Sequence, residues 1–170
     1  NQSIHADWIK ENKGNFVELE KTMFELVFAN DINPYAKLVW DKFFNKKEIY
    51  HLGSVVDLVK TEKFGLDIFP RNIDIVTGGF PCQPFSSAGM QLGTDDPYGR
   101  GAMLGHIIRI CKIKKPKYIL LENVKGFSHG KFQPIHDQLV KDLREMGYGE
   151  NPLAKAVLNS KDYGIPQNRE

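Results

Sequence analysis

Cysteine is scarce in this chain of 170 residues, which contains only Cys82 and Cys111. Two cysteines so far apart in the sequence match neither a disulfide framework nor a zinc site. The five histidines show no metal-ligand spacing, and we expect no metal. This sparing use of cysteine is typical of proteins in a reducing compartment, so a cytoplasmic location is the simplest interpretation.

Long apolar runs are also missing, which excludes a transmembrane helix and a membrane partner. Residues 1–10 are polar and do not form a signal peptide. Neither sign of charge dominates, because 23 basic and 21 acidic residues leave a net charge of +2. That small excess permits a nucleic-acid partner but does not argue for one. The remaining composition, 41% hydrophobic and 26% charged, is that of a globular domain.

Apolar runs alternate with helical patterns along the chain. Strands are expected at FELVFAND (24–31), IDIVTGGF (73–80), KYILLENV (117–124) and the start of 153–170, and helices at 33–44, 101–115 and 132–149. Asn33 and Pro34 are suited to the cap and first position of the first helix. Because the strands are nearly continuous hydrophobic runs, this order predicts an α/β domain whose parallel sheet is covered on both faces.

Unusual polar or reactive residues follow three of the expected strands. Asp31 follows the first, Pro81-Cys82 follows IDIVTGG, and Glu122-Asn123 ends KYILL. In parallel sheets, ligands bind beyond the carboxyl ends of the strands. The sequence therefore predicts that these groups form one site.

Each of these groups also has a purely structural interpretation. Cys82, within GGFPCQPFSSAG, is either a nucleophile activated by exposed backbone N–H groups or part of a rigid turn. Glu122 either performs charge chemistry or ends its strand in a salt bridge. Asp31 either holds a ribose or caps a helix. Cys111 is expected to be a small buried hydrophobe. Four lysines are expected to form a solvated helix end rather than a phosphate site: Lys112, Lys114, Lys115 and Lys117.

Three motifs in a fixed order carry a family resemblance. GGFPCQPFSSAG is followed, forty residues after its cysteine, by the glutamate of LLENVKGF, and later by YGIPQNRE. With VFANDINPYA, they make residues 24–170 resemble the DNA cytosine-5 methyltransferases of bacterial restriction–modification systems. The resemblance implies a Rossmann-like fold and transfer of a methyl group from S-adenosyl-L-methionine. It also implies that the cytosine is flipped out of duplex DNA.

The resemblance assigns catalytic roles to five residues. It makes Cys82 the thiolate that adds to carbon-6 of cytosine, and Glu122 the acid that contacts ring nitrogen 3 and the amino group. Asn123 would help to hold the Cys82 loop. Gln167 and Arg169 begin a Gln-x-Arg-x-Arg motif whose first arginine contacts the target base.

The resemblance also implies binding roles. Cofactor contacts fall on Asp31, Ile32, Ser54, Val55, Phe80 and Pro81, and contacts to DNA phosphate or base fall on Ser86 and Arg100. Asp31 would bind the ribose and Ile32 would cover the adenine, while Phe80 and Pro81 would contribute their backbone. Ser54 stands where the family has an acid that contacts the adenine amino group, and Asp57 lies one helical turn further on.

Two departures suggest an incomplete enzyme. The polar segment 1–23 lacks the glycine-rich first motif of the family, and the catalytic core, 24–170, stops inside Gln-x-Arg-x-Arg. We therefore expect these residues alone to bind cofactor weakly and not to methylate DNA. A missing C-terminal region or a second polypeptide would supply target recognition.

Three other functions remain open from the residues. Methylation of cytosine in transfer RNA would use the same chemistry. A non-catalytic member of the family typically loses the cysteine or the glutamate, and this chain keeps both. A cysteine hydrolase would need a base near Cys82, and the nearest histidine in the sequence, His106, falls within an expected helix.

Overall fold

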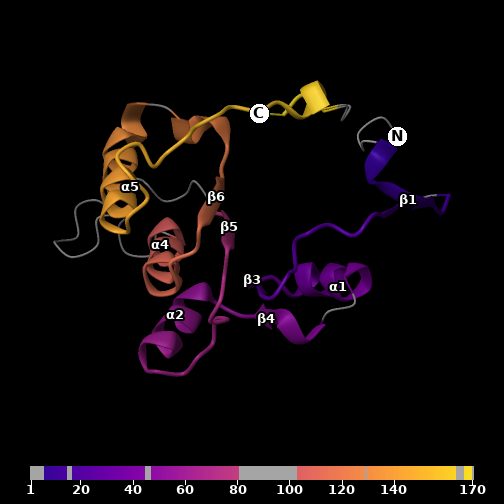
Figure 1. Cartoon of the computed structure of the whole chain (residues 1–170), viewed down its shortest axis with the longest axis horizontal. Coiled ribbons are helices and arrows are strands. Elements are labelled where there is room, and N and C mark those ends of the chain that lie inside the picture. The colour runs from indigo at the N-terminus through magenta and orange to yellow at the C-terminus, as the bar shows by residue number, and fades with distance from the viewer. Residues whose placement is uncertain are drawn as a thin grey trace. The chain divides into compact units, whose positions relative to one another are not determined.

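The computed structural model describes residues 6–14, 17–44, 47–80, 103–128, 130–163 and 167–169. The chain divides into two compact units, one of Asn1–Leu26 with Lys155–Glu170 and one of Val27–Ala154 (Figure 1). Every buried hydrophobic side chain that the structure describes belongs to the second unit. Among the described residues, no helix has the length and apolar character that a bilayer span requires.

The first unit contains a hairpin and, among its described residues, two 3-10 turns. Strand β1, Ile9–Asn12, pairs antiparallel with β2, Val17–Leu19, and the turns cover Ala6–Trp8 and Ser160–Tyr163. The sequence predicted only a polar segment before residue 24. The strand expected at the start of 153–170 is wrong, since the described residues there form none and Val157 and Leu158 are exposed. The two strands that the structure describes in this unit, β1 and β2, pair with each other.

The second unit begins with a short parallel pair of strands. Strand β3, Ala29–Asp31, pairs with β4, Tyr50–Leu52, and helix α1, Pro34–Phe43, connects them. The predicted cap is confirmed: Oδ1 of Asn33 accepts a hydrogen bond from the Tyr35 N–H at 2.9 Å, and Pro34 is the first helical residue. The strand predicted over 24–31 is shorter, because β4 offers three residues to pair with.

A second parallel pair follows in the same unit. Strand β5, Ile75–Gly79, pairs with β6, Tyr118–Glu122, and Gly79 lies opposite Glu122. The helices of this part are α2 (Val55–Lys63), α4 (Met103–Lys114) and α5 (Gln133–Glu145). The predicted α/β class and the parallel pairing of strands are thereby confirmed.

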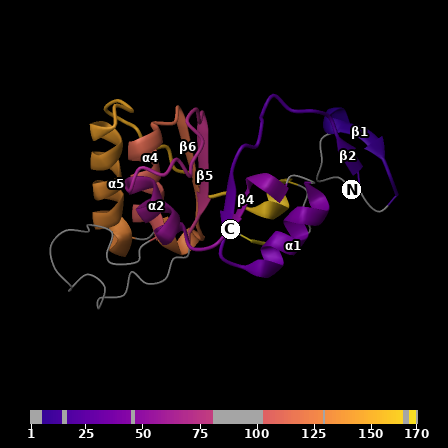
Figure 2. The same ribbon diagram turned by 90° about the horizontal axis from the view of Figure 1, so that it is seen from below.

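The helices pack on one face of the β5–β6 pair, where Figure 2 shows α2, α4 and α5 on the same side. The principal core consists of Phe80, Leu104, Ile108, Phe132, Ile135, Leu139 and Leu143, with Ile119 and Leu121 of β6 packed against it. A Cβ on Gly78 would lie 2.6 Å from Cδ1 of Ile107, so α4 packs directly on the strand. Alternate residues point the other way, and Tyr118 and Leu120 are 68% and 65% exposed. Within the described residues, the predicted helical cover of this second face of the β5–β6 pair is therefore not found.

A smaller cluster joins α2 to α4. Val59, Phe69 and Ile110 are buried together. Beside them Glu62 and Lys114 form an ion pair whose side chains are 5% and 8% exposed. The prediction that Lys114 belongs to a solvated helix end is therefore wrong, because a carboxylate from α2 covers its ammonium group. Lys112 and Lys117 are also ion-paired, with Asp142 and Asp74.

Candidate active site

The end of the β5–β6 pair brings together two segments that the sequence singles out. Glu122 is the last residue of β6 and its carboxylate lies over Gly79, since a Cβ there would be 3.3 Å from Oε2. Gly79 thus leaves room for the acid. The Glu122 side chain is exposed rather than sealed in the core, so it can reach a molecule bound above the strand ends.

Asn123 ties the two strand ends to each other. Its Nδ2 donates to the carbonyl of Phe80 at 2.9 Å, and its Oδ1 accepts from the Val124 N–H at 2.8 Å. Phe80 is itself fixed, because its ring is buried and meets Phe127 edge-on with centroids 5.3 Å apart. The chain therefore leaves β5 from an anchored residue immediately before Pro81.

The end of the β3–β4 pair has a similar tie. Nδ2 of Asn30 donates to the carbonyls of His51 and Gly53, at 2.8 and 2.9 Å, and the Gly53 N–H donates to the carbonyl of Asp31. Oδ1 of Asp31 accepts from the Asn33 N–H at 2.7 Å. The Asp31 side chain is exposed and Ile32 is 70% exposed. An acid and an apolar side chain thus project together from this strand end.

The neighbouring residues Ser54 and Val55 also have structural roles. Ser54 caps α2, with its Oγ accepting from the Val56 N–H at 3.2 Å. Val55 packs against the Val59–Phe69–Ile110 cluster. Asp57, one turn further, is exposed and lies 3.6 Å from the Lys60 ammonium.

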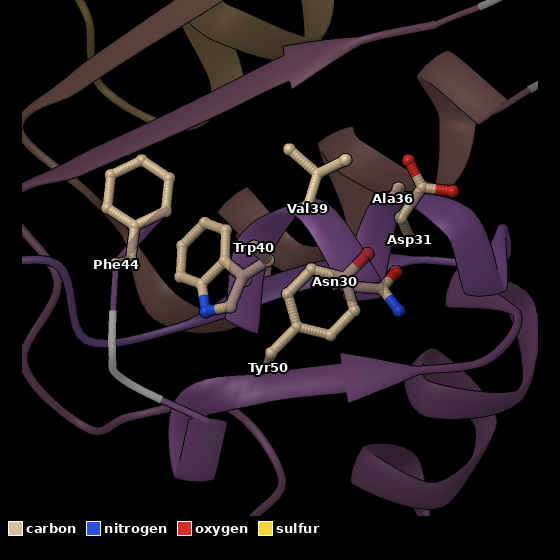
Figure 3. A pocket seen from close by; sticks show the side chains of 8 residues that line it. Asn30, Asp31, Ala36, Val39, Trp40, Phe44 and Tyr50 are labelled. Atoms are coloured by element: carbon tan, nitrogen blue, oxygen red, sulfur yellow. The ribbon is translucent and has the colours of Figure 1, made fainter. Parts of the chain in front are cut away.

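An open pocket of about 450 Å³ adjoins Asp31, between α1 and the β3–β4 pair. Its lining consists of Ala29, Asn30, Asp31, Ala36, Val39, Trp40, Phe44 and Tyr50. Figure 3 shows Asp31 at one end and Phe44 at the other. The Tyr50 hydroxyl is buried here without a hydrogen-bond partner among the described residues. Burial, with the negative charges of Asp31 and Asp41, raises the pKa of Tyr50.

The remaining predicted residues fall into two groups. Pro81, Cys82, Ser86 and Arg100 lie outside the described residues. Gln167 and Arg169 belong to the first unit, where Ser160 donates hydrogen bonds to both of their carbonyls. Of the predicted residues, the structure thus places Asp31 beside Gly53 and Ser54 at the end of the β3–β4 pair. It places Phe80 beside Glu122 and Asn123 at the end of the β5–β6 pair.

Comparison with known proteins adds the family. The sequence profile of the C-5 cytosine-specific DNA methylases matches residues 13–170.

The chain belongs to this methylase family.

Named relatives of this chain are type II methyltransferases. M.HhaI of Haemophilus parahaemolyticus is 38% identical over 154 residues, which are 89% of this chain and 42% of the relative. M.XorII of Xanthomonas oryzae pv. oryzae is 37% identical over 151 residues, 88% of this chain and 34% of the relative. M.NgoPII of Neisseria gonorrhoeae is 35% identical over 152 residues, 89% and 41% respectively. The chain therefore spans less than half the length of these relatives.

The structure describes one of the two cysteines of this chain. Cys111 is fully buried in α4, and burial raises the pKa of its thiol to about 12. It is the small buried hydrophobe that the sequence predicted, and at neutral pH it stays a thiol. Any thiolate chemistry of the chain consequently rests on Cys82.

Sequence reasoning missed three residues that shape the candidate site. Asn30 ties β3 to β4, Gly79 makes room for Glu122, and Tyr50 carries the buried hydroxyl of the pocket. A polar residue inside the apolar run FELVFAND was a usable signal for Asn30. Nothing in the sequence marked Tyr50, whose ring packs against Trp40 of the preceding helix α1.

Proposed function

We propose that the protein containing this chain transfers a methyl group to carbon-5 of cytosine in duplex DNA, as the modification enzyme of a restriction–modification system. The observation that carries the proposal is the strand end where Asn123 holds the Phe80 carbonyl and Glu122 lies over Gly79. Membership of the methylase family supports it, as do the names of the relatives.

Carbon-5 of cytosine is a poor nucleophile. Cys82 is proposed to make carbon-5 more nucleophilic by adding to the ring. Its thiolate adds to carbon-6, forming an S–C bond and turning the ring into an enamine. Glu122 stabilises the charge that develops at ring nitrogen 3 and the amino group through a hydrogen bond. Carbon-5 of the enamine would then bond to the methyl group, and the sulfur of the donor would leave as a thioether. Loss of the carbon-5 proton to water and cleavage of the S–C bond restore both the aromatic ring and the thiolate. Asn123 would position the Cys82 segment through Phe80.

The residues at the β3–β4 end fit a nucleoside-bearing methyl donor. Asp31 uses one carboxylate oxygen for the Asn33 N–H, and its second oxygen can accept from ribose hydroxyls. Ile32 is exposed beside it and can cover a base. S-adenosyl-L-methionine, when bound, supplies an electrophilic methyl group on sulfonium. A base that reacts here must leave the DNA stack, and Arg100, Ser86 and Arg169 are the proposed contacts to DNA.

Covalent trapping tests the nucleophile. Duplex DNA in which every cytosine is 5-fluorocytosine includes any recognition site and blocks loss of the carbon-5 substituent. With S-adenosyl-L-methionine present, we expect a denaturation-resistant protein–DNA adduct in the parent protein and in Cys111→Ser, but none in Cys82→Ser. Peptide mapping should place the adduct on residue 82. An adduct that survives in Cys82→Ser, or maps to Cys111, would refute the mechanism.

A further inference from the structure

Asn159 stands out in the first unit. Among the described residues of that unit it is the only buried one, at 7% exposed, and it is polar. A buried amide is costly unless its hydrogen-bonding groups are satisfied. The hydrogen-bond partners of the Asn159 side chain therefore indicate which segments of the unit it fixes.

The hydrogen bonds of the Asn159 side chain fix its orientation. Oδ1 accepts from the Lys161 N–H at 3.2 Å, and Nδ2 donates to Oδ1 of Asn168 at 2.7 Å. Because a backbone N–H can only donate, the Asn159 oxygen must face Lys161 and the amide nitrogen must face Asn168. The residue thus closes a local turn on one side and reaches nine positions along the chain on the other.

Ser160 completes the attachment. Its backbone N–H donates to the carbonyl of Arg169 at 2.9 Å, and its Oγ donates to the carbonyl of Gln167. Each of the three residues 167–169 thereby receives one hydrogen bond from Asn159 or Ser160. The bonds to Gln167 and Arg169 use backbone carbonyls, and the side chains of both residues remain exposed.

We propose that Asn159 and Ser160 form a clamp that fixes the backbone of residues 167–169 and so positions the Arg169 side chain for DNA. This inference rests on the proposed function, which assigns Arg169 to the target base. In the clamp, the Asn168 side chain serves as an anchor, and the guanidinium of Arg169 projects from a backbone held on both sides. Asn159 is a positioning residue, since it would act through Arg169 and not touch the DNA.

Two substitutions of equal size test the clamp without DNA. Asn159→Asp turns the Nδ2 donor into an oxygen that faces the Asn168 oxygen, whereas Asn168→Asp keeps the oxygen that accepts. Amide hydrogen exchange of the Ser160 N–H, measured by NMR in the 170-residue chain, reports the bond to Arg169. We expect Asn159→Asp to accelerate this exchange by roughly fivefold to tenfold, as for loss of one hydrogen bond, and Asn168→Asp to leave it unchanged.

Ser160→Ala provides a second, milder variant should Asn159→Asp disrupt the unit. It removes only the Oγ bond to Gln167, and we expect roughly threefold faster exchange of the Ser160 N–H, in keeping with a weak exposed bond. The amides of α4 serve as the internal reference in every variant. Unchanged Ser160 exchange in both Asn159→Asp and Ser160→Ala would overturn the clamp.

A double-mutant cycle tests the positioning role. Affinity for a 30-base-pair random-sequence duplex is measured by fluorescence anisotropy for Asn159→Asp, Arg169→Ala and the combination. We expect each single variant to bind more weakly and the combination to bind no more weakly than Arg169→Ala alone. Additive losses, or an unaffected Asn159→Asp, would overturn positioning through Arg169. If Arg169→Ala itself changes nothing, the assigned DNA contact fails and positioning fails with it, while the exchange data still decide the clamp.

Discussion

Two tyrosines show at the scale of single residues what one buried hydroxyl contributes. Tyr50 is 9% exposed, and its hydroxyl has no partner among the described residues. Tyr148 is partly buried and donates its hydroxyl to the carbonyl of Pro116. Burial raises the pKa of both side chains, so both hydroxyls are neutral donors at pH 7. The two residues are therefore a matched pair that differs in hydrogen bonding.

We expect opposite effects from removing these hydroxyls. Tyr50→Phe should leave the free energy of unfolding unchanged or raise it by about 1 kcal/mol, because an unpaired buried hydroxyl carries a desolvation cost. Tyr148→Phe should lower it by about 1 kcal/mol, since the Pro116 carbonyl loses its donor. Urea unfolding at pH 7, followed by far-UV circular dichroism, measures both. A clear loss of stability in Tyr50→Phe would show that its hydroxyl is paired in solution.

At the scale of elements, the Glu62–Lys114 pair links the C-terminal ends of α2 and α4. Glu62 also accepts the N–H groups of Ile68 and Phe69, at 2.7 and 3.1 Å, and so holds the chain that follows α2. Burial by itself raises the pKa of Glu62, but the hydrogen bonds from Lys114, Phe69 and Ile68 outweigh it. The pKa consequently lies below its ordinary value of 4.5.

This lowered pKa predicts how stability depends on pH. The folded state favours the carboxylate, so its contribution is complete above pH 4.5 and is lost as the pH falls through the lowered pKa. Glu62→Gln should lower the free energy of unfolding by about 3 kcal/mol at pH 7, because it leaves the Lys114 ammonium buried without a charged partner. Urea unfolding at several pH values measures this. The difference in free energy of unfolding between the parent protein and Glu62→Gln should become smaller below pH 4.5.

The exposed pair Asp57–Lys60 is the control for this experiment. It lies on the same helix, its side chains are 73% and 67% exposed, and Asp57→Asn should change stability by less than about 0.5 kcal/mol. A Glu62→Gln variant as mild as Asp57→Asn would mean that water reaches the buried pair. If the difference in free energy of unfolding between the parent protein and Glu62→Gln stayed constant down to pH 3, the pKa of Glu62 would not be lowered.

The elements also show how far sequence reasoning reaches. Alternating apolar runs predicted the α/β order, and local chemistry predicted the Asn33 cap; both are confirmed. The prediction of a solvated Lys114 failed because its partner, Glu62, is far away in sequence. At the site, the positions of Glu122 and Asn123 at a strand end followed from the sequence. The bond from Asn123 to Phe80 joins residues 43 positions apart and needed the fold.

At the scale of the whole molecule, the two units differ in what stabilises them. The unit Val27–Ala154 contains all the buried hydrophobic side chains that the structure describes, and burial of apolar surface is the main driving force of folding. In the β1–β2 hairpin of the other unit, Glu18 bonds to Lys10 and Lys13, and these hydrogen bonds lower the pKa of Glu18 to about 2. Such exposed ion pairs contribute little to stability.

Native-state hydrogen exchange should therefore resolve two levels of stability in one chain. We expect amides of α4 and α5 to exchange only through global unfolding of their unit, and amides of β1 and β2 to exchange at least roughly a hundredfold faster. Adding sub-denaturing urea should speed the α4 and α5 amides, because their opening exposes buried surface, and should leave the hairpin amides nearly unaffected. If hairpin and helix amides instead showed the same free energy and the same urea dependence, the chain would unfold as one cooperative body, and the hairpin would owe its stability to contacts beyond its ion pairs.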